Sequence, residues 1–280
     1  MLAPHRLAAL DDLPVELNAA SAQVILPLFR ADHGLENKFA EGSGFDPVTE
    51  ADKGAERAIR ALLAERVPDH GVIGEEYGED RPDAEFVWVL DPVDGTRAFV
   101  AGLPVWTTLI SLRYQGKPVL GSIGQPFIGE IFIGHAGGSR LIDSTGTRPL
   151  KVRACPSLSQ AIIATTDPEG CFSSAEMSAW QSVRKATRLA RLGCDAYAYA
   201  MVAAGTLDMV MEAGLKSWDI ESAIPLIAGA GGQVTDWRGQ PIDQQGGQAL
   251  INAAENTLKH AGGHYGPAHM ASKGPIRSEE

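Results

Sequence analysis

The sequence of 280 residues has few cysteines and a shortage of basic residues. Its three cysteines, Cys155, Cys171 and Cys194, are an odd number without Cys-x-x-Cys spacing. This argues against a disulfide framework or a zinc knuckle and favours a reducing compartment. The 24 Lys and Arg against 35 Asp and Glu give a formal net charge of -11. A nucleic-acid partner is not expected, because phosphate backbones are held mainly by cations.

Long apolar runs are absent as well. No stretch reaches the length of a membrane span, and the amino terminus lacks a cationic region followed by an apolar one. We therefore expect no membrane partner, no signal peptide and a cytoplasmic location. The 44% of hydrophobic residues is enough for a large buried core. A small phosphorylated substrate remains compatible with the negative charge, since bound metal ions can supply positive charge.

The most informative segment is residues 91–96, Asp-Pro-Val-Asp-Gly-Thr, which follows an apolar run over residues 86–90. The run predicts a buried strand, with Asp91 and Asp94 at its carboxyl end, where α/β sheets place ligand sites. Two buried carboxylates need compensation, and Mg²⁺ favours carboxylate oxygens. The Gly-Thr pair would open a helix whose first N–H groups attract an anion. The segment thus predicts a metal ion beside a phosphate.

Residues 1–150 are predicted to form helices followed by a meandering antiparallel sheet that carries most of the site acids. Thr49 with Asp52 three residues later predicts a capped helix over residues 51–67. Residues 36–47, rich in glycine, are interpreted as a mobile loop. A short strand is predicted over residues 71–77, and further strands separated by Gly and Pro turns follow residue 96, which indicates antiparallel pairing.

Residues 151–255 show a different pattern, in which strands alternate with helices. The pattern includes a strand near residues 186–192 and a helix over residues 196–204, and it predicts a second α/β layer. Residues 256–280 lack apolar periodicity and are predicted to be a disordered tail. We therefore expect two layered units and a tail.

Four acids stand where a strand is predicted to end or a helix to begin: Glu75, Asp91, Asp94 and Asp219. Three of them also have a purely structural explanation. Asp219 is explained as a helix cap, Glu75 with Glu76 as a solvated pair, and Asp94 as part of a simple turn. No pattern within the sequence shows that the four side chains meet.

Three motifs occur in order: Gly-Glu-Glu at residues 74–76, the segment 91–96, and Trp-Asp at residues 218–219 followed by Gly-Ala-Gly-Gly at residues 229–232. In order and spacing they resemble the signature motifs of the inositol monophosphatase family of Mg²⁺-dependent phosphatases. The resemblance covers most of the chain. It implies an α/β (α+β) fold, the layered αβαβα sandwich of inositol monophosphatases and fructose-1,6-bisphosphatases, and a homodimer.

The resemblance also implies roles for individual residues. Two or three Mg²⁺ ions would be bound by four carboxylates and one backbone carbonyl, from Glu75, Asp91, Val93, Asp94 and Asp219. The N–H groups of Gly95 and Thr96 would hold the phosphate. Glu75, Thr96 and Asp52 would serve catalysis, with Asp52 orienting Thr96 to help activate the attacking water. A helix-capping role is the alternative for Asp52.

The substrate is indicated by residues 191–199, which contain the pattern Gly-x-Asp-x-Tyr-x-Tyr. This pattern resembles the histidinol-phosphate phosphatase branch of the family. Asp195 and Glu212 would then face the ammonium and imidazole groups of histidinol phosphate, which a polyol phosphate lacks. Asp195 has an alternative role as the cap of a helix that begins at Ala196. Lys-Ser-Trp at residues 216–218 departs from the branch and is closer to the general family.

The leading hypothesis is therefore hydrolysis of L-histidinol phosphate to L-histidinol and phosphate, late in histidine biosynthesis. The first alternative is an inositol monophosphatase or a broad sugar-phosphate phosphatase. The second is a binding protein associated with the transcription machinery, as some members of the family are.

Overall fold

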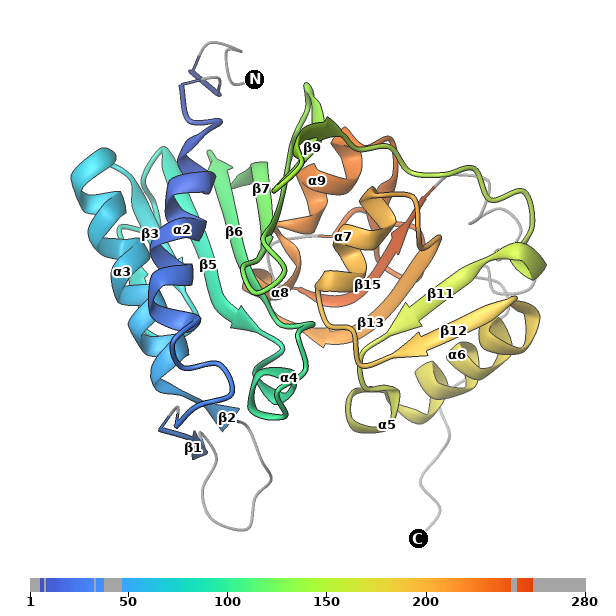
Figure 1. Ribbon diagram of the computed structural model, residues 1–280. Helices are drawn as coiled ribbons and strands as arrows, with labels where there is room; N and C mark the ends of the chain where they lie inside the picture. Colours follow the sequence, from blue (N-terminus) through green and yellow to red (C-terminus); the bar gives the residue numbers. More distant parts are fainter. Residues whose placement is uncertain (1–5, 8, 33, 38–46, 243–245, 254–280) are drawn as a thin grey trace, which may run out of the picture.

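The computed structural model describes residues 6–7, 9–32, 34–37, 47–242 and 246–253. Two sheets and their helices stack in the order helix, sheet, helix, sheet, helix (Figure 1). The predicted mixed α/β fold is confirmed. The boundary at residue 150 stays a prediction, and the predicted tail 256–280 lies outside the described residues. No helix among the described residues is long and apolar enough to span a membrane.

The outer layer beside the first sheet consists of α2 (Leu13–Ile25) and α3 (Glu50–Arg66). The predicted capping box at the start of α3 is present, because the N–H of Thr49 donates to Asp52 Oδ2 at 2.7 Å. The apolar faces of both helices pack on the sheet, where Ile59 contacts a buried cluster that includes Trp88. Burial of these faces holds the helices in place.

The first sheet has eight strands in the order β10-β9-β8-β7-β6-β5-β3-β4. Their bounds are β3 (Gly71–Gly74), β4 (Gly78–Asp80), β5 (Phe86–Asp94), β6 (Thr107–Tyr114), β7 (Lys117–Gln125), β8 (Glu130–His135), β9 (Gly138–Asp143) and β10 (Gly146–Pro149). The predicted antiparallel meander is confirmed from β5 to β10. Only the β3–β5 pair of this sheet is parallel, with Gly74 opposite Leu90.

Three boundaries in this half differ from prediction. The strand predicted over residues 71–77 ends at Gly74, because the next residues form a turn into β4. The strand predicted to end at Leu90 continues to Asp94, with a register irregularity between Asp91 and Asp94. The ends of the predicted loop 36–47 pair as β1 (Glu36–Asn37) and β2 (Pro47–Val48), and residues 38–46 lie outside the described part of the chain.

The second sheet has five strands in the order β12-β11-β13-β15-β14. Their bounds are β11 (Ile162–Thr165), β12 (Leu189–Leu192), β13 (Met209–Leu215), β14 (Gln233–Thr235) and β15 (Gly247–Asn252). The short helices η1 (Leu158–Gln160) and α5 (Pro168–Cys171) flank β11, and α6 (Ser174–Ala186) covers the outer face. The strand predicted from residue 186 begins three residues later, because Ala186 still belongs to α6.

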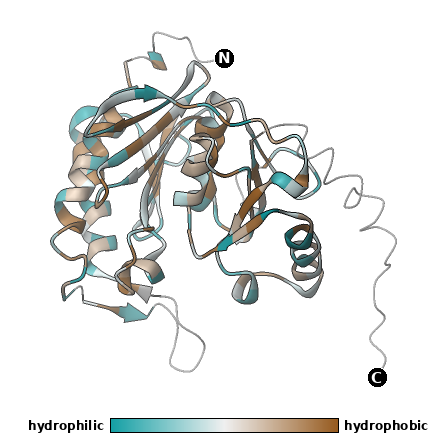
Figure 2. Cartoon of the chain, turned by 45° about the vertical axis from the view of Figure 1, so that its right-hand side comes forward, coloured by the Kyte–Doolittle hydropathy of each residue, from teal (hydrophilic) through white to brown (hydrophobic). Residues whose placement is uncertain are grey.

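The middle layer lies between the sheets and consists of α7 (Tyr197–Ala203), α8 (Ser217–Ile220) and α9 (Ala223–Gly229), while α4 (Thr96–Val100) follows β5 at the lower edge (Figure 1). Figure 2 shows apolar colour along the strands and polar patches on the outer helices. The middle helices approach the first sheet closely, since a Cβ at Gly121 would overlap with the carbonyl of Ser222. This packing brings the second half of the chain to the carboxyl end of β5.

Candidate active site

A cavity of about 230 Å³ lies where β3, β5 and β13 meet the first turns of α4, α7 and α8. It is lined by nine of the ten residues predicted for the site: Glu75, Asp91, Val93, Asp94, Gly95, Thr96, Asp195, Glu212 and Asp219. The tenth, Asp52, lies behind Thr96 and is bonded to it. The fold thus gathers in one cavity residues that are far apart in the sequence.

Glu75 and Asp91 are neighbours because of the parallel register of β3 and β5. The pairing of Gly74 with Leu90 places the next residue of each strand side by side. The N–H of Glu75 donates to the carbonyl of Leu90 at 3.2 Å. Asp91 is only 3% exposed, and its Oδ1 accepts a hydrogen bond from the N–H of Val93 at 3.1 Å. Sheet register, rather than any local pattern, brings these two acids together.

Gly95 stands between β5 and α4 with φ of 80°, a backbone conformation that glycine adopts without strain. A Cβ at this position would lie 2.9 Å from Cγ of Asp195. The glycine therefore serves both the sharp turn and the close approach of the Asp195 carboxylate. The prediction that Gly95 and Thr96 open a helix is confirmed, although α4 is only five residues long.

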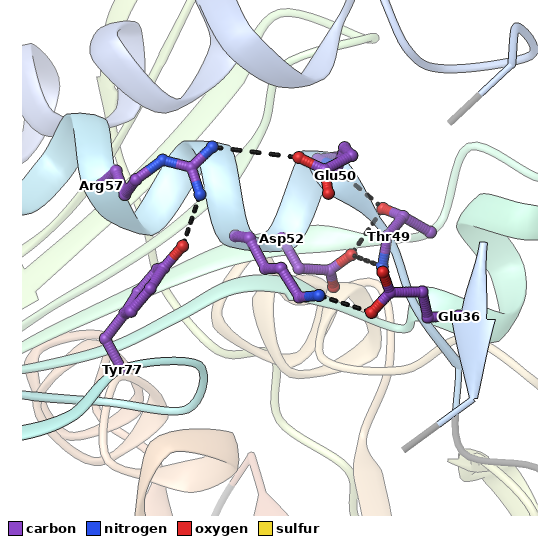
Figure 3. A network of polar contacts seen from close by, with 8 residues as sticks. Glu36, Thr49, Glu50, Asp52, Arg57 and Tyr77 are labelled. Atoms are coloured by element: carbon purple, nitrogen blue, oxygen red, sulfur yellow. Dashed lines mark hydrogen bonds and ion pairs between the residues drawn. The ribbon is translucent and has the colours of Figure 1, made fainter. Parts of the chain in front are cut away.

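The hydroxyl of Thr96 has two acceptors, Asp52 Oδ1 at 3.1 Å and the carbonyl of Val93 at 3.0 Å. Asp52 is buried, and its Oδ2 accepts from the N–H and the hydroxyl of Thr49 (Figure 3). The two roles considered for Asp52 therefore coexist, since one carboxylate oxygen caps α3 and the other binds Thr96. Desolvation by burial raises the pKa of Asp52, against the lowering effect of its bonds to Thr49.

Asp94 connects the two halves of the molecule. Its Oδ2 accepts a hydrogen bond from the N–H of Ala196 at 2.8 Å, at the start of α7.

The capping alternative for Asp195 is wrong, because Ala196 occupies the cap position and no side chain caps α7 in the described structure. Asp195 has a positive φ of 44°, which an aspartate tolerates better than most residues. Its carboxylate lines the cavity instead.

Glu212 and Asp219 complete the acidic lining from the second half. Glu212, on β13, is 3% exposed, and its Oε1 accepts from the hydroxyl of Thr166 at 2.9 Å. Asp219, in α8, accepts at Oδ2 from the N–H of Lys216 at 2.6 Å. Asp219 therefore takes part in capping its helix while it lines the cavity, so the structural explanation and the site position coexist for this residue.

The cavity is strongly acidic. Burial, followed by the negative charges of Glu75 and other acids, raises the pKa of Asp91 well above its ordinary value. Burial and the charge of Asp195 do the same for the pKa of Asp94. Burial also raises the pKa of Asp195 to about 6 and that of Glu212 to about 8. Such a set of acids favours the binding of cations.

The chemistry of this donor set suits Mg²⁺, which prefers carboxylate and carbonyl oxygens. The charges that act most strongly on Asp91 are negative and come from Glu75, Asp94, Asp219 and Asp52. Within the described residues, however, no three His, Cys, Asp or Glu side chains stand as close together as a bound metal ion requires. Binding of an ion would therefore have to draw these side chains inward. The residue types and the electrostatics fit the metal, whereas the side-chain positions are more open than a loaded site.

Sequence reasoning missed six residues that line the cavity: Thr166, Cys171, Tyr199, Ala213, Gly214 and Leu215. Tyr199 is 3% exposed, and its hydroxyl makes no hydrogen bond with any residue that the structure describes. Burial and the charges of Glu212 and Asp94 raise its pKa, so the hydroxyl is neutral. The signal that could have identified it is the second tyrosine of the Gly-x-Asp-x-Tyr-x-Tyr pattern.

Comparison with known proteins identifies the family of the chain. Residues 7–270 match the model of the inositol monophosphatase family. The bifunctional phosphatase IMPL2, chloroplastic, of Arabidopsis thaliana is 42% identical over 241 residues, which are 85% of this chain and 67% of that protein. A histidinol-phosphatase of Chlorobaculum parvum is 31% identical over 214 residues, 76% of this chain and 82% of its own.

The fold has equally clear relatives among solved structures. An inositol monophosphatase from Zymomonas mobilis superposes with a TM-score of 0.78 and 34% identity, over 93% of this chain and 98% of that one. The family match, the relatives and the layered architecture lead to the same conclusion: the chain belongs to the inositol monophosphatase family.

Proposed function

We propose that this phosphatase-family member hydrolyses L-histidinol phosphate to L-histidinol and phosphate with the help of Mg²⁺. Enzymes of the family are phosphatases and are generally metal-dependent. The observation that supports this substrate is the presence of two further acids, the half-buried Asp195 and the buried Glu212, in the same cavity as the acids of the Asp91–Asp94 region. A substrate with cationic groups matches this lining.

The residues proposed to hold two or three Mg²⁺ ions are the carboxylates of Glu75, Asp91, Asp94 and Asp219, with the carbonyl of Val93. Bound Mg²⁺ would neutralise phosphate oxygens and lower the pKa of a coordinated water. Without such a cation, the acids of the lining would repel a phosphate. The proposed metal therefore reconciles an acidic cavity with an anionic substrate.

The chain's own groups would orient the phosphate and the attacking water. The N–H groups of Gly95 and Thr96 precede a helix and are suited to bind phosphate oxygens. If the Thr96 hydroxyl donates to Asp52, its lone pairs are free to accept a hydrogen bond from a water molecule and so to orient that water toward phosphorus. Glu75 would be the third catalytic residue beside Thr96 and Asp52. Asp52 thus acts through Thr96, because its carboxylate fixes the direction of the Thr96 hydroxyl proton.

Asp195 and Glu212 would recognise the alcohol part of the substrate. Burial raises the pKa of both side chains, because the hydroxyl of Thr166 beside Glu212 and the charge of Arg97 near Asp195 compensate the ionised carboxylates only in part. An ammonium group and an imidazolium ring would supply two positive charges to two acids. A polyol offers hydroxyl groups but no charge, and it would leave the cost of desolvating these acids uncompensated.

The second candidate is an inositol monophosphatase or a broad sugar-phosphate phosphatase. It is favoured by the 34% identity with the inositol monophosphatase of Zymomonas mobilis over nearly the whole chain. A cytoplasmic location and a homodimer stay predictions from the sequence, and a binding protein associated with the transcription machinery stays the second alternative.

A panel assay with Mg²⁺ tests the proposal. We expect kcat/KM for histidinol phosphate to exceed that for inositol 1-phosphate and for glycerol 2-phosphate by at least about tenfold, a difference that one well-placed charged contact supplies. Chelation with EDTA should abolish turnover, and added Mg²⁺ should restore it. Faster turnover of inositol phosphate would overturn the proposed substrate, and full activity in EDTA would overturn the metal.

A further inference from the structure

The turn that carries Glu75 is held by a buried acid that the proposed mechanism does not use. Glu56, on α3, has no exposed side-chain surface. Its Oε2 accepts a hydrogen bond from the N–H of Glu76 at 2.8 Å, and its Oε1 accepts one from the N–H of Tyr77 at 3.2 Å. One carboxylate therefore binds the two backbone amides that directly follow Glu75.

Two arginines on the same helix strengthen this attachment. Nε of Arg60 donates to Glu56 Oε1 at 2.7 Å, which compensates the buried negative charge. Arg60 also donates to the carbonyl of Gly78, at the end of the turn. Arg57 reaches the hydroxyl of Tyr77, as Figure 3 shows. The helix α3 thus contacts the turn at the amides, at one carbonyl and at one side chain.

Gly74, the glycine of the Gly-Glu-Glu motif, is required by the same contact. A Cβ at Gly74 would overlap with the carboxylate of Glu56. The N–H of Glu75 is engaged as well, with the carbonyl of Leu90 on β5. Three consecutive amides therefore have fixed acceptors, which leaves the backbone of Glu75 little freedom to move.

The same helix carries Asp52 one turn before Glu56, at the i, i+4 spacing that places both side chains on one face. Asp52 binds Thr96, and Glu56 binds the turn of Glu75. From these contacts we propose that Glu56 is a positioning residue, which sets the Glu75 carboxylate relative to Asp91 and Thr96. The proposal rests on the proposed Mg²⁺-dependent function, in which Glu75 is a metal ligand and a catalytic residue.

The variant Glu56→Gln tests this role. Glutamine keeps the size of the side chain, but its NH₂ group would face a backbone N–H where an acceptor is needed. We expect faster hydrogen exchange at the amides of Glu76 and Tyr77 in the metal-free protein. We also expect the Mg²⁺ concentration for half-maximal activity to rise about 10- to 100-fold, the usual effect of losing a group that orients a metal ligand. KM for the substrate at saturating Mg²⁺ should change little.

Gly74→Ala provides a second, independent variant. The added methyl group displaces the Glu56 carboxylate without changing any charge, so it should raise the Mg²⁺ requirement and speed exchange in the same direction. If Glu56→Gln does not fold, Gly74→Ala still tests whether the Glu56 carboxylate positions Glu75.

Asp208→Asn is the matched control for loss of stability. Asp208 is fully buried and is bonded like Glu56, since it accepts from Nε of Arg153 at 2.7 Å and from the N–H of Ile162 at 2.7 Å. It precedes β13 at the end away from the cavity. This variant should lower Tm and leave the Mg²⁺ requirement unchanged.

The outcomes separate the two proposals. If Glu56→Gln lowers Tm as Asp208→Asn does but changes neither the Mg²⁺ requirement nor the exchange of the two amides, Glu56 has only a structural role and the inference is wrong. If the wild-type protein shows no Mg²⁺-dependent phosphatase activity, the proposed function fails. Exchange in the metal-free variant would then still report whether Glu56 holds the turn.

Discussion

The two halves of the molecule contribute to the cavity in different ways. In the first half, Asp52, Thr96 and the turn of Glu75 are joined to their neighbours by short hydrogen bonds. In the second half, Asp195 and Tyr199 line the cavity without a side-chain hydrogen bond to any described residue. The first half thus has its partners in place before a ligand arrives, whereas the second half offers polar groups that a ligand would complete.

This difference suggests that the first half serves the hydrolysis reaction and that the second half selects the substrate. Every phosphate ester needs the same contacts to metal and phosphate, so a rigid arrangement of the groups proposed for these contacts does not restrict the range of substrates. Of the groups proposed to bind the alcohol part, Asp195 has no side-chain hydrogen bond to a described residue and Glu212 is bonded to hydroxyl groups alone, so a substrate that lacks cationic groups leaves their charges uncompensated. Variants of the two halves should therefore produce different kinetic patterns.

The largest effect is expected for Asp94→Asn, which changes both halves at once. The variant removes a proposed metal ligand and weakens the acceptor for the N–H of Ala196. We expect turnover of every phosphate ester to fall about 100- to 1,000-fold or more, measured as kcat with saturating Mg²⁺. Asp12→Asn, at a position with a 95% exposed side chain, is the control and should leave kcat unchanged. Persistent activity of Asp94→Asn would remove the proposed metal mechanism.

Asp195→Asn should affect only one class of substrate. Asparagine tolerates the positive φ of this position, so the backbone is not strained. Loss of one charge-assisted contact should lower kcat/KM for histidinol phosphate about 10- to 100-fold and leave inositol phosphate turnover nearly unchanged. An equal loss for both esters would show that the second half also serves the chemistry, and an unchanged value would refute the role of Asp195 in selectivity.

Tyr199→Phe should have a smaller effect and an unusual signature. Removal of the hydroxyl should lower kcat/KM for histidinol phosphate about 3- to 10-fold. Tm should not fall, because the hydroxyl has no hydrogen-bond partner among the described residues to lose. Tyr197→Phe is the matched control, since its hydroxyl donates to Glu130 Oε2 at 2.7 Å and its loss should lower Tm without changing kcat/KM. If Tyr197→Phe lowers kcat/KM and Tyr199→Phe lowers only Tm, the substrate contact belongs to Tyr197 and the prediction is wrong.

The smallest effect concerns stability and pH in the metal-free protein. Burial raises the pKa of Glu212 from its ordinary value of 4.5 to about 8. Between these values the folded state binds more protons than the unfolded state, so the free energy of unfolding should fall as the pH rises. In urea titrations between pH 4.5 and about 8, the free energy of unfolding of Glu212→Gln should fall less with pH than that of the wild-type protein. The exposed control Glu65→Gln should keep the wild-type slope, and a wild-type protein that gains stability with pH would contradict the prediction.

Much of the first half could be predicted from local patterns. Thr49 and Asp52 predicted the capped start of α3, because a capping box is formed by residues three apart. The apolar run before Asp91 predicted a buried strand, and the strand is buried from Phe86 onward. The turn after Gly74 was missed, since its cause is Glu56, nearly 20 residues earlier in the chain.

The second half was harder to predict in detail. The alternation of strands and helices was evident, but β14 and β15 were missed, because β14 has only three residues and β15 begins at a glycine. The suggested cap at Asp195 was wrong, because α7 begins one residue later than predicted and Ala196 occupies the cap position. The sequence pattern also gave no sign that the N–H of Ala196 would bind Asp94, which lies about a hundred residues away in the chain.

The amino-acid sequence by itself determined the residue types of the site, the local caps and turns, and the apolar strands that bear them. These features depend on hydrogen bonds and burial periods within a few residues. Only the tertiary structure decided that Glu75 lies beside Asp91, that Asp94 reaches α7, and that Glu56 holds the turn of Glu75. The physical reason is that sheet register and close packing at glycines act between distant segments, and no local pattern specifies them.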